Sequence, residues 1–281
     1  MAANLDKAYL DKIEEVLVLG IRDFMKKGGF SRAHLGLSGG LDSSLVAYLA
    51  TEAAGPENIT CFYMPSRFSS QQSKDDAGEQ AAILGCRYDT LPIEEIYSAC
   101  LSVLAGVFEN RPFDITEENL QSRIRGTLLM AFSNKFNSML FTTGNKSEIA
   151  MGYCTLYGDT NGALAPIGGL YKTEVFALSK RINERSIAAG GKVIIPEAII
   201  DKPPSAELRP NQKDEDSLPP YEVLDPILKA HLDDKLSNEE IVKKGWDAEL
   251  VERIVKAVSH SEFKRRQMPP VLKVSGAEDG G

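Results

Sequence analysis

The sequence is poor in cysteine, histidine and unbroken apolar runs, and each shortage excludes a class of protein. Four cysteines in 281 residues, with no C-x-x-C spacing, argue against a disulfide framework and a structural zinc site and favour free, mostly buried thiols. Three histidines are too few and too dispersed for a metal cluster. No apolar run reaches the roughly 18 residues that span a bilayer, and residues 1–15 lack the apolar core of a signal peptide. We therefore expect a soluble, cytoplasmic protein that does not enter a membrane.

An excess of basic residues is also missing. Lysine and arginine number 32 against 40 acids, which gives a formal net charge of −8. Broad binding of nucleic acid needs a basic face, so we expect no nucleic-acid partner. The hydrophobic fraction of 43% and the charged fraction of 26% are ordinary globular values and exclude a wholly disordered chain. Any phosphate ligand must be held by local groups against an unfavourable overall charge.

Short segments rich in β-forming residues alternate with amphipathic segments along the first two thirds of the chain. This alternation predicts an α/β fold, with a doubly wound parallel sheet and helices on both faces. Ligands of such sheets bind outside the carboxyl ends of the strands. The predicted strands are 33–37, 59–64, 87–91 and 139–142. The predicted helices are 5–27, 43–54, 69–84, 93–107, 116–136, 146–151, 172–189, 221–232, 237–244 and 248–259.

The rest of the chain contains no internal repeat and no convincing linker. Residues 193–195 are expected to be extended, and residues 201–220, rich in proline, serine and charge, form a long loop. Loops of that length are uncommon and usually mobile or functional. We expect one domain over residues 1–274, followed by a disordered tail over residues 275–281.

The most informative motif is the turn Ser38-Gly39-Gly40-Leu41-Asp42-Ser43, between the first predicted strand and its helix. Glycines let the backbone turn tightly and approach a ligand closely, and a helix N-terminus attracts anions. The turn is neither a Walker A loop nor a G-x-G-x-x-G motif. Asp42 would repel phosphate unless a bound Mg²⁺ bridged the two. The alternative is a turn whose serine and aspartate only cap the helix.

This turn resembles the S-G-G-x-D-S loop of the ATP pyrophosphatase (PP-loop) superfamily. Further segments, in this order along residues 5–274, closely resemble the NAD synthetase family. They are N-L-Q-S-R-I-R-G from Asn119, T-T-G-N-K-S-E from Thr142, T-L-Y-G-D from Thr155, P-I-G-G-L-Y-K from Pro166, K-P-P-S-A-E-L from Lys202 and F-K-R-R-Q from Phe263. The resemblance implies an adenine nucleotide alpha hydrolase-like, Rossmann-like fold.

The resemblance also implies a reaction, the ATP-dependent amidation of deamido-NAD⁺ to NAD⁺ through an adenylated nicotinate carboxylate. AMP and pyrophosphate would be released, ammonia would be the nitrogen donor, and Mg²⁺ would be the cofactor. The implied assembly is a homodimer in which long helices form the substrate sites near the interface, and 116–136 is the matching candidate. That helix could equally be buried within one subunit.

The implied site residues fall into overlapping groups. Asp42, Glu148 and Lys172 would be catalytic, and Asp42 and Glu148 would hold the metal. Each of the implied residues could instead be an ordinary solvated or turn residue, most of all Lys264, which lies in a basic run. ATP would contact Gly36, Leu37, Ser38, Gly39, Gly40, Leu41, Asp42, Ser43, Thr143, Lys172 and Ser205. Deamido-NAD⁺ would contact Asn119, Arg125, Glu148, Asp159 and Lys264.

Three positions depart from the ammonia-dependent members of the family and resemble the synthetase module of the glutamine-dependent class. They are Leu156, Ala163 and Phe263. We expect no glutaminase domain within these 281 residues, so ammonia would come free from solution or from a separate glutaminase partner. The competing hypotheses are another PP-loop adenylating amidotransferase or a tRNA-modifying enzyme, and a non-catalytic nucleotide-binding module. A tRNA-modifying enzyme should have a broad basic surface or a catalytic cysteine pair, and neither is evident. A non-catalytic module should have lost Asp42, Glu148 or Lys172, and all three are present.

Overall fold

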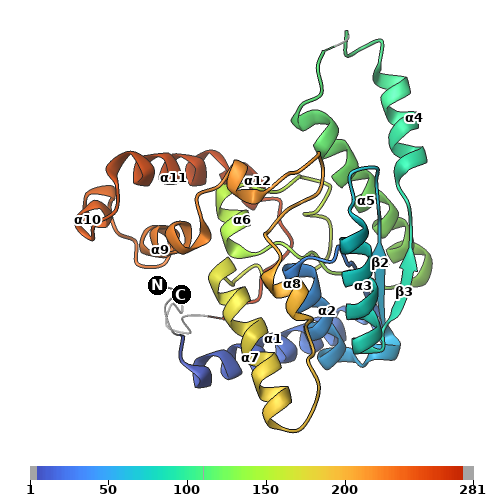
Figure 1. Cartoon of the computed structure of the whole chain (residues 1–281), viewed down its shortest axis with the longest axis horizontal. Helices are drawn as coiled ribbons and strands as arrows, with labels where there is room; N and C mark the ends of the chain where they lie inside the picture. Colours follow the sequence, from blue (N-terminus) through green and yellow to red (C-terminus); the bar gives the residue numbers. More distant parts are fainter. Residues whose placement is uncertain (1–4, 110, 275–281) are drawn as a thin grey trace.

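A central parallel sheet organises the computed structural model, which describes residues 5–109 and 111–274 (Figure 1). Its strands lie in the order β3-β2-β1-β4, and each neighbouring pair is parallel. Ala33 is in register with both Ile59 and Met139, so the strands begin level and end at one edge. The predicted parallel α/β sheet is confirmed. The strands are β1 (Ala33–Gly36), β2 (Ile59–Tyr63), β3 (Arg87–Thr90) and β4 (Met139–Leu140).

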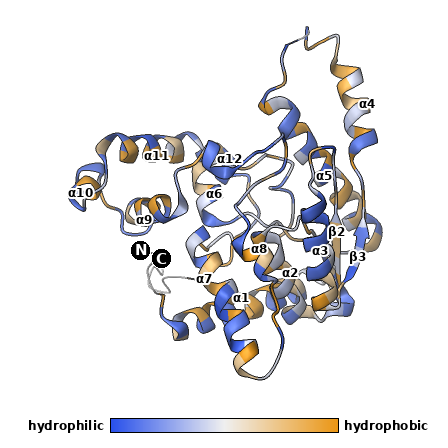
Figure 2. Cartoon of the chain, viewed as in Figure 1, coloured by the Kyte–Doolittle hydropathy of each residue, from blue (hydrophilic) through white to orange (hydrophobic). Residues whose placement is uncertain are grey.

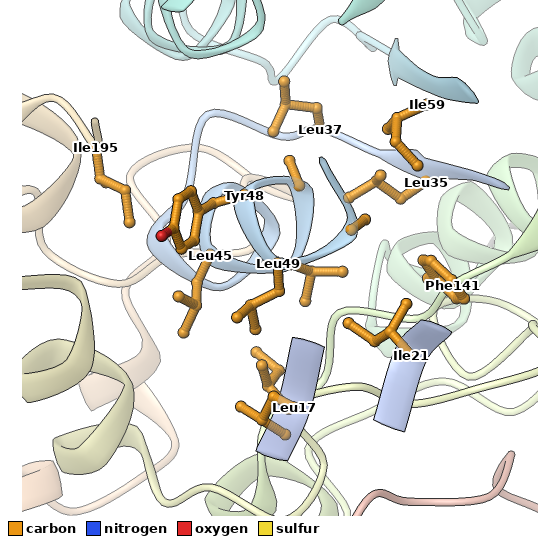
Figure 3. Close-up of a cluster of buried hydrophobic side chains, with 14 of the residues drawn as sticks. Leu17, Ile21, Leu35, Leu37, Leu45, Tyr48, Leu49, Ile59, Phe141 and Ile195 are labelled. Carbon is orange, nitrogen blue, oxygen red and sulfur yellow. The ribbon is translucent and has the colours of Figure 1, made fainter. Parts of the chain in front are cut away.

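Four helices cover one face of this sheet. Their buried apolar side chains, which are alanines in the third helix and mostly larger aliphatic residues in the others, form the largest core cluster together with β1 and β2 (Figure 3). Leu17 of the first helix and Leu45 of the second are both fully buried there. Tyr48 lies in the same layer, and its hydroxyl donates to Glu14 Oε1 at 2.7 Å. The helices are α1 (Lys7–Gly28), α2 (Leu41–Ala54), α3 (Gln71–Leu84) and α7 (Lys172–Ala188).

Helices α4 (Glu94–Leu104) and α5 (Ile115–Phe136) cover the opposite face. An apolar stripe of α5 with four-residue spacing, from Leu120 to Phe132, packs there, and a second face of the helix buries Glu118, Gln121 and Ser122. His34 of β1 is enclosed on this side between Ser138 Oγ and the Leu129 carbonyl, at 2.9 and 3.0 Å. Burial lowers the pKa of this imidazole to about 4. It is therefore neutral at physiological pH and serves the core.

The C-terminal helices form a separate layer beside the sheet, at the left of Figure 1. Leu224, Ile241 and Val251 are fully buried in their shared core, which reaches the sheet through α6 and Tyr171. The C-terminal helices are α9 (Tyr221–Leu232), α10 (Asn238–Lys243), α11 (Ala248–His260) and α12 (Glu262–Arg265), and α6 (Lys146–Met151) comes earlier in the chain.

Several details differ from the sequence-based expectations. Helix α8 (Glu197–Asp201) was not predicted, and residues 193–195 form no strand but lead into it through a bend. Single parallel bridges, Phe141 with Leu164 and Ala165 with Val271, continue the sheet beyond β4. The long loop contains a short 3-10 turn, Asp214–Asp216. The tail at 275–281 lies outside the described residues. No helix within 5–109 and 111–274 is long and apolar enough to cross a membrane.

Candidate active site

A cavity of about 400 Å³ opens at the carboxyl ends of β1, β2 and β4. It is walled by the glycine turn, one face of α5, the start of α6, the first residue of α7 and the long loop before α9. All the residues that the resemblance implies as catalytic, metal-binding or substrate-binding line this cavity except Gly39. Residues 226 positions apart in the sequence, Ser38 and Lys264, therefore share one space.

The glycine turn has a conformation that its sequence requires. Gly39 has φ +78°, and a Cβ there would lie 2.3 Å from the Ser73 carbonyl oxygen. Gly39 is therefore behind the cavity wall, where it lets the turn press against α3. The hydroxyls of Ser43 and Ser44 each donate to the Gly40 carbonyl at 3.0 Å. These bonds fix the turn directly before the N-terminus of α2, which suits the binding of an anion.

Asp42 is held on both of its carboxylate oxygens. Oδ1 accepts from Asn145 Nδ2 at 3.1 Å, and Oδ2 accepts from the ammonium of Lys172. The Lys172 side chain is 3% exposed and that of Asp42 is 17% exposed. Burial by itself disfavours the charged lysine, but Asp42 and Glu148 outweigh it, so the pKa of Lys172 is raised. The cavity thus contains a lysine that stays cationic at neutral pH.

Glu148 lies on α6, one turn from Asn145. Its Oε2 accepts from the Asn145 backbone N–H at 3.2 Å, and the Asn145 side chain accepts from the Glu148 N–H at 3.0 Å. This reciprocal capping box explains why α6 begins here. Burial, and after it the charge of Asp42, raises the pKa of the Glu148 carboxyl well above its usual range.

The acids at this end of the cavity fit a nucleotide-bound Mg²⁺. Carboxylate oxygens are its preferred protein ligands, and Mg²⁺ commonly takes one or two of them together with substrate phosphates. Burial first and the charge of Asp42 second raise the pKa of Glu148, and a bound cation would offset both effects. Among the residues described, no three His, Cys, Asp or Glu side chains are close enough to hold an ion by themselves. The phosphates of a ligand would complete such a site.

The other end of the cavity lies where the loop of residues 152–161, which follows α6, contacts α5. Asp159 accepts from the Thr155 backbone N–H at 2.8 Å, and Asn119 accepts from the Thr155 hydroxyl at 2.7 Å. A Cβ on Gly158 would lie 2.3 Å from Ser122 Oγ, so the loop lies directly on α5. Asp159 is accessible from the cavity, yet the protein around it desolvates the carboxyl and raises its pKa to about 6.

Two basic residues flank this end. Arg125 donates through Nε to the Met64 carbonyl at 2.9 Å, and burial lowers its pKa to about 10, so it remains a cation. Lys264 donates to the carbonyls of Gly152 and Cys154, at 2.8 and 2.7 Å. Both side chains line the cavity. Lys264 is therefore not a freely solvated member of its basic run.

The long loop is folded over the end of the cavity that contains the glycine turn. Ser205 donates to the Gln212 carbonyl at 2.6 Å, which closes a compact turn within the loop. Glu207 accepts from the hydroxyls of Ser70 and Ser73, at 2.8 and 2.7 Å, and from the Ser70 N–H at 3.1 Å. The loop is thereby anchored to the N-terminus of α3, a favourable place for a carboxylate.

Sequence reasoning missed several polar residues of the site. Asn145 stood inside a quoted motif but was given no role, and Asp214 and Glu207 stood in the long loop. Asp214 is 4% exposed, lines the cavity and accepts from the Tyr221 hydroxyl at 2.8 Å. Burial raises its pKa. Glu207 stood in the quoted K-P-P-S-A-E-L segment without a role, and the only sequence signal for Asp214 was the unusual length of the loop.

Known proteins with similar sequences and structures support one family. The NAD synthase family profile matches residues 13–269. A glutamine-dependent NAD(+) synthetase of Synechocystis is 50% identical over 273 residues, which cover 97% of this chain and 48% of that protein. The chain spans about half the length of the curated relatives it matches.

Two solved structures cover nearly the same length as this chain. One is an NH3-dependent NAD synthetase from Campylobacter jejuni, with a TM-score of 0.72, 30% identity and coverage of 94% of this chain and 99% of that one. The other is an NMN synthetase from Francisella tularensis, with a TM-score of 0.76, 29% identity and coverage of 91% and 95%. With a family profile that matches most of its length and a cavity lined by the family's motifs, the chain belongs to the NAD synthase family.

Proposed function

We propose that the chain catalyses the ATP-dependent amidation of deamido-NAD⁺ to NAD⁺. The nicotinate carboxylate oxygen attacks the α-phosphorus of ATP, and pyrophosphate leaves. Ammonia then attacks the acyl carbon of the adenylate, loses a proton and displaces AMP. The observation that carries the proposal is the single cavity that joins the glycine turn, the Asp42–Glu148–Lys172 cluster and the polar residues of α5.

At the end of the cavity that contains the glycine turn, the chain's own groups would act on the ATP phosphates by positioning and electrostatics. The backbone of the glycine turn and the N-terminus of α2 would bind the phosphates, with Thr143 and Ser205 as further contacts. Lys172 would place a fixed positive charge beside the charge that builds on the leaving pyrophosphate. Asp42 and Glu148 would hold Mg²⁺, which supplies Lewis-acid neutralisation of the phosphates when bound.

At the other end, the residues offer complementary groups for a dinucleotide. Arg125 and Lys264 carry positive charge, and Asn119 and Asp159 supply hydrogen-bonding oxygens. We propose that they hold deamido-NAD⁺ with its carboxylate toward Glu148. The folded loop around Ser205 would exclude water, which protects the adenylate from hydrolysis.

Two nitrogen sources fit the proposed reaction. Leu156, Ala163 and Phe263 match the glutamine-dependent class, and the relatives of that class are about twice as long as this chain. We propose ammonia as the immediate nucleophile, drawn from solution or delivered by a glutaminase. All four cysteines are free thiols, which fits a reducing compartment such as the cytoplasm, our proposed location.

We also propose a homodimer formed through the α4–α5 hairpin, which projects from the rest of the molecule (Figure 1). Only Tyr97 of α4 is buried, although the helix is apolar along much of its length (Figure 2). Val103 is 79% exposed, Val107 75% and Ile115 62%. An exposed apolar surface of this kind is typical of an interface. The variant Val103→Asp should convert a dimer to a monomer in size-exclusion chromatography with light scattering.

One assay tests the reaction. Purified protein is incubated with deamido-NAD⁺, ATP, Mg²⁺ and either ammonium or glutamine, and NAD⁺ and AMP are measured. NAD⁺ and AMP should form in equal amounts with ammonium. No NAD⁺ with either nitrogen source would refute the proposal. A second candidate reaction is the amidation of nicotinate mononucleotide, because one structural neighbour of similar length is an NMN synthetase. A parallel incubation with nicotinate mononucleotide in place of deamido-NAD⁺ tests it.

A further inference from the structure

Asn145 connects the two carboxylates that are proposed to hold the metal. Its amide Nδ2 donates to Asp42 Oδ1 at 3.1 Å, across 103 residues of sequence. Its Oδ1 accepts from the Glu148 N–H at 3.0 Å, and its own N–H donates to Glu148 Oε2 at 3.2 Å. One residue thus contacts both acids, which come from different helices.

The capping of α6 does not by itself require asparagine. An N-cap needs one side-chain oxygen, and serine, threonine or aspartate supplies it about equally well. The amide nitrogen is the part that a cap does not use, and here it is committed to Asp42. Asn145 is fully buried and is not among the residues that line the cavity. It cannot touch the substrate and would act only through its neighbours.

The hydrogen bond from Asn145 also gives the two carboxylate oxygens of Asp42 different partners. Oδ1 is engaged by a neutral donor that lies behind the cavity wall, whereas Oδ2 is engaged by the ammonium of Lys172, which lines the cavity. Only Oδ2 can exchange its partner for a cation without breaking the link between the two helices. The distance and orientation of Asp42 relative to Glu148 are set by the same link.

We propose that Asn145 is a positioning residue for the metal-binding pair. It orients Asp42 and fixes the position of this carboxylate relative to that of Glu148. The inference rests on the proposed function, in which these acids share Mg²⁺ with ATP. Removing the amide while keeping the cap should weaken binding of the divalent ion much more than it affects folding.

The test uses Asn145→Ser, with Asn145→Thr as a second variant that also keeps a capping oxygen. Binding of Mn²⁺ to the protein is measured by electron paramagnetic resonance in the presence of a non-hydrolysable ATP analogue. Loss of one hydrogen bond to a charged group should weaken Mn²⁺ binding about tenfold. Thermal unfolding is followed in parallel and should change little. A matched control is Asn58→Ser, which removes a hydrogen bond that the Asn58 side-chain amide donates to the Ala54 carbonyl at the far end of α2.

The outcomes separate this inference from the proposed function. If Asp42→Asn abolishes Mn²⁺ binding but both Asn145 variants bind it as tightly as the unmodified chain, Asn145 has no positioning role and the metal site stands. If Asp42→Asn leaves Mn²⁺ binding unchanged, the metal site itself is wrong, and the inference falls with it. An equal loss of Mn²⁺ affinity in Asn58→Ser would show that the effect is a general one on folding, which also overturns the inference.

Discussion

The Lys172 ammonium and the Asp42 carboxylate form an ion pair between the first residue of α7 and the first turn of α2. Lys172 is almost completely buried, and its charge is maintained because two acids face it. The pair therefore joins the cation and one of the anions on which the proposed chemistry depends. It also brings together two motifs that lie 130 residues apart.

Replacing Asp42 by asparagine removes one charge from this group while keeping the shape of the side chain. We expect kcat to fall roughly 100- to 1,000-fold, as when other preorganised electrostatic groups are removed. The fold should persist because Glu148 still faces Lys172. Steady-state kinetics and circular dichroism check both points, and Asp234→Asn, at an exposed aspartate, is the control. Unchanged turnover in Asp42→Asn would remove the metal-binding role.

The glycine turn predicts a contrast between two glycines of nearly equal φ. Gly39 and Gly190 have φ +78° and +80°, but a Cβ meets the Ser73 backbone at 2.3 Å in the first and nothing within 4 Å in the second. Gly190→Ala should lose only the conformational cost, about 1–2 kcal/mol. Gly39→Ala should lose more stability and also bind ATP more weakly, because the turn must move. Denaturant unfolding and nucleotide titration measure the two effects; equal losses would contradict this explanation.

Asp159 predicts the pH dependence of substrate binding. Its pKa is raised to about 6, so it loses its negative charge as the pH falls through 6. If the carboxylate accepts hydrogen bonds from deamido-NAD⁺, KM for that substrate should rise below pH 6, about tenfold per unit well below the pKa. Asp159→Asn should have a high KM that is flat between pH 5 and 7. The idea fails if the two proteins share one pH profile.

The stability of the fold should respond to Asp159 in the opposite direction. A carboxyl whose pKa is higher in the folded state than in the unfolded chain binds its proton more tightly when folded. Its ionisation therefore destabilises the fold above pH 6, and this cost disappears as the pH falls toward 4. Asp159→Asn should lack this contribution in urea unfolding measured across the same range of pH.

Glu207 predicts how firmly the long loop is anchored. Glu207→Gln keeps an acceptor oxygen but removes the charge that binds Ser70, Ser73 and the N-terminus of α3. Limited proteolysis should cut residues 202–217 faster, and KM for ATP should rise severalfold. Glu215→Gln, an exposed acid in the same loop, is the matched control and should behave like the unmodified chain. Equal proteolysis rates would show that Glu207 does not anchor the loop.

Local sequence patterns predicted the sheet and most helices because each of these elements has its own periodicity and its own boundaries. The ends of α1 and α2 at Gly29 and Gly55 are examples, since a glycine follows each last turn. Helix α8 was missed because it has only five residues. The polar buried face of α5 was also missed, since its burial depends on a loop that contacts it from elsewhere in the chain.

Site residues were predicted where a motif of the family supplies their role. They were missed where the role comes from a contact between distant segments of the chain. Lys172 and Glu148 were found through their motifs, and the cavity contains them. The bond from Asn145 to Asp42 spans two motifs, and no pattern within either one indicates it. The anchoring of Glu207 to α3 depends on the path of the long loop, which propensity does not determine.

The sheet is completed late along the chain. Ala165 pairs with Val271, and its N–H donates to the Pro270 carbonyl at 2.9 Å. The whole helical layer from α9 to α12 lies in the sequence between these two paired segments. During synthesis, the strand edge beside Ala165 therefore stays open until residue 271 has left the ribosome, after every residue of the cavity wall has already emerged.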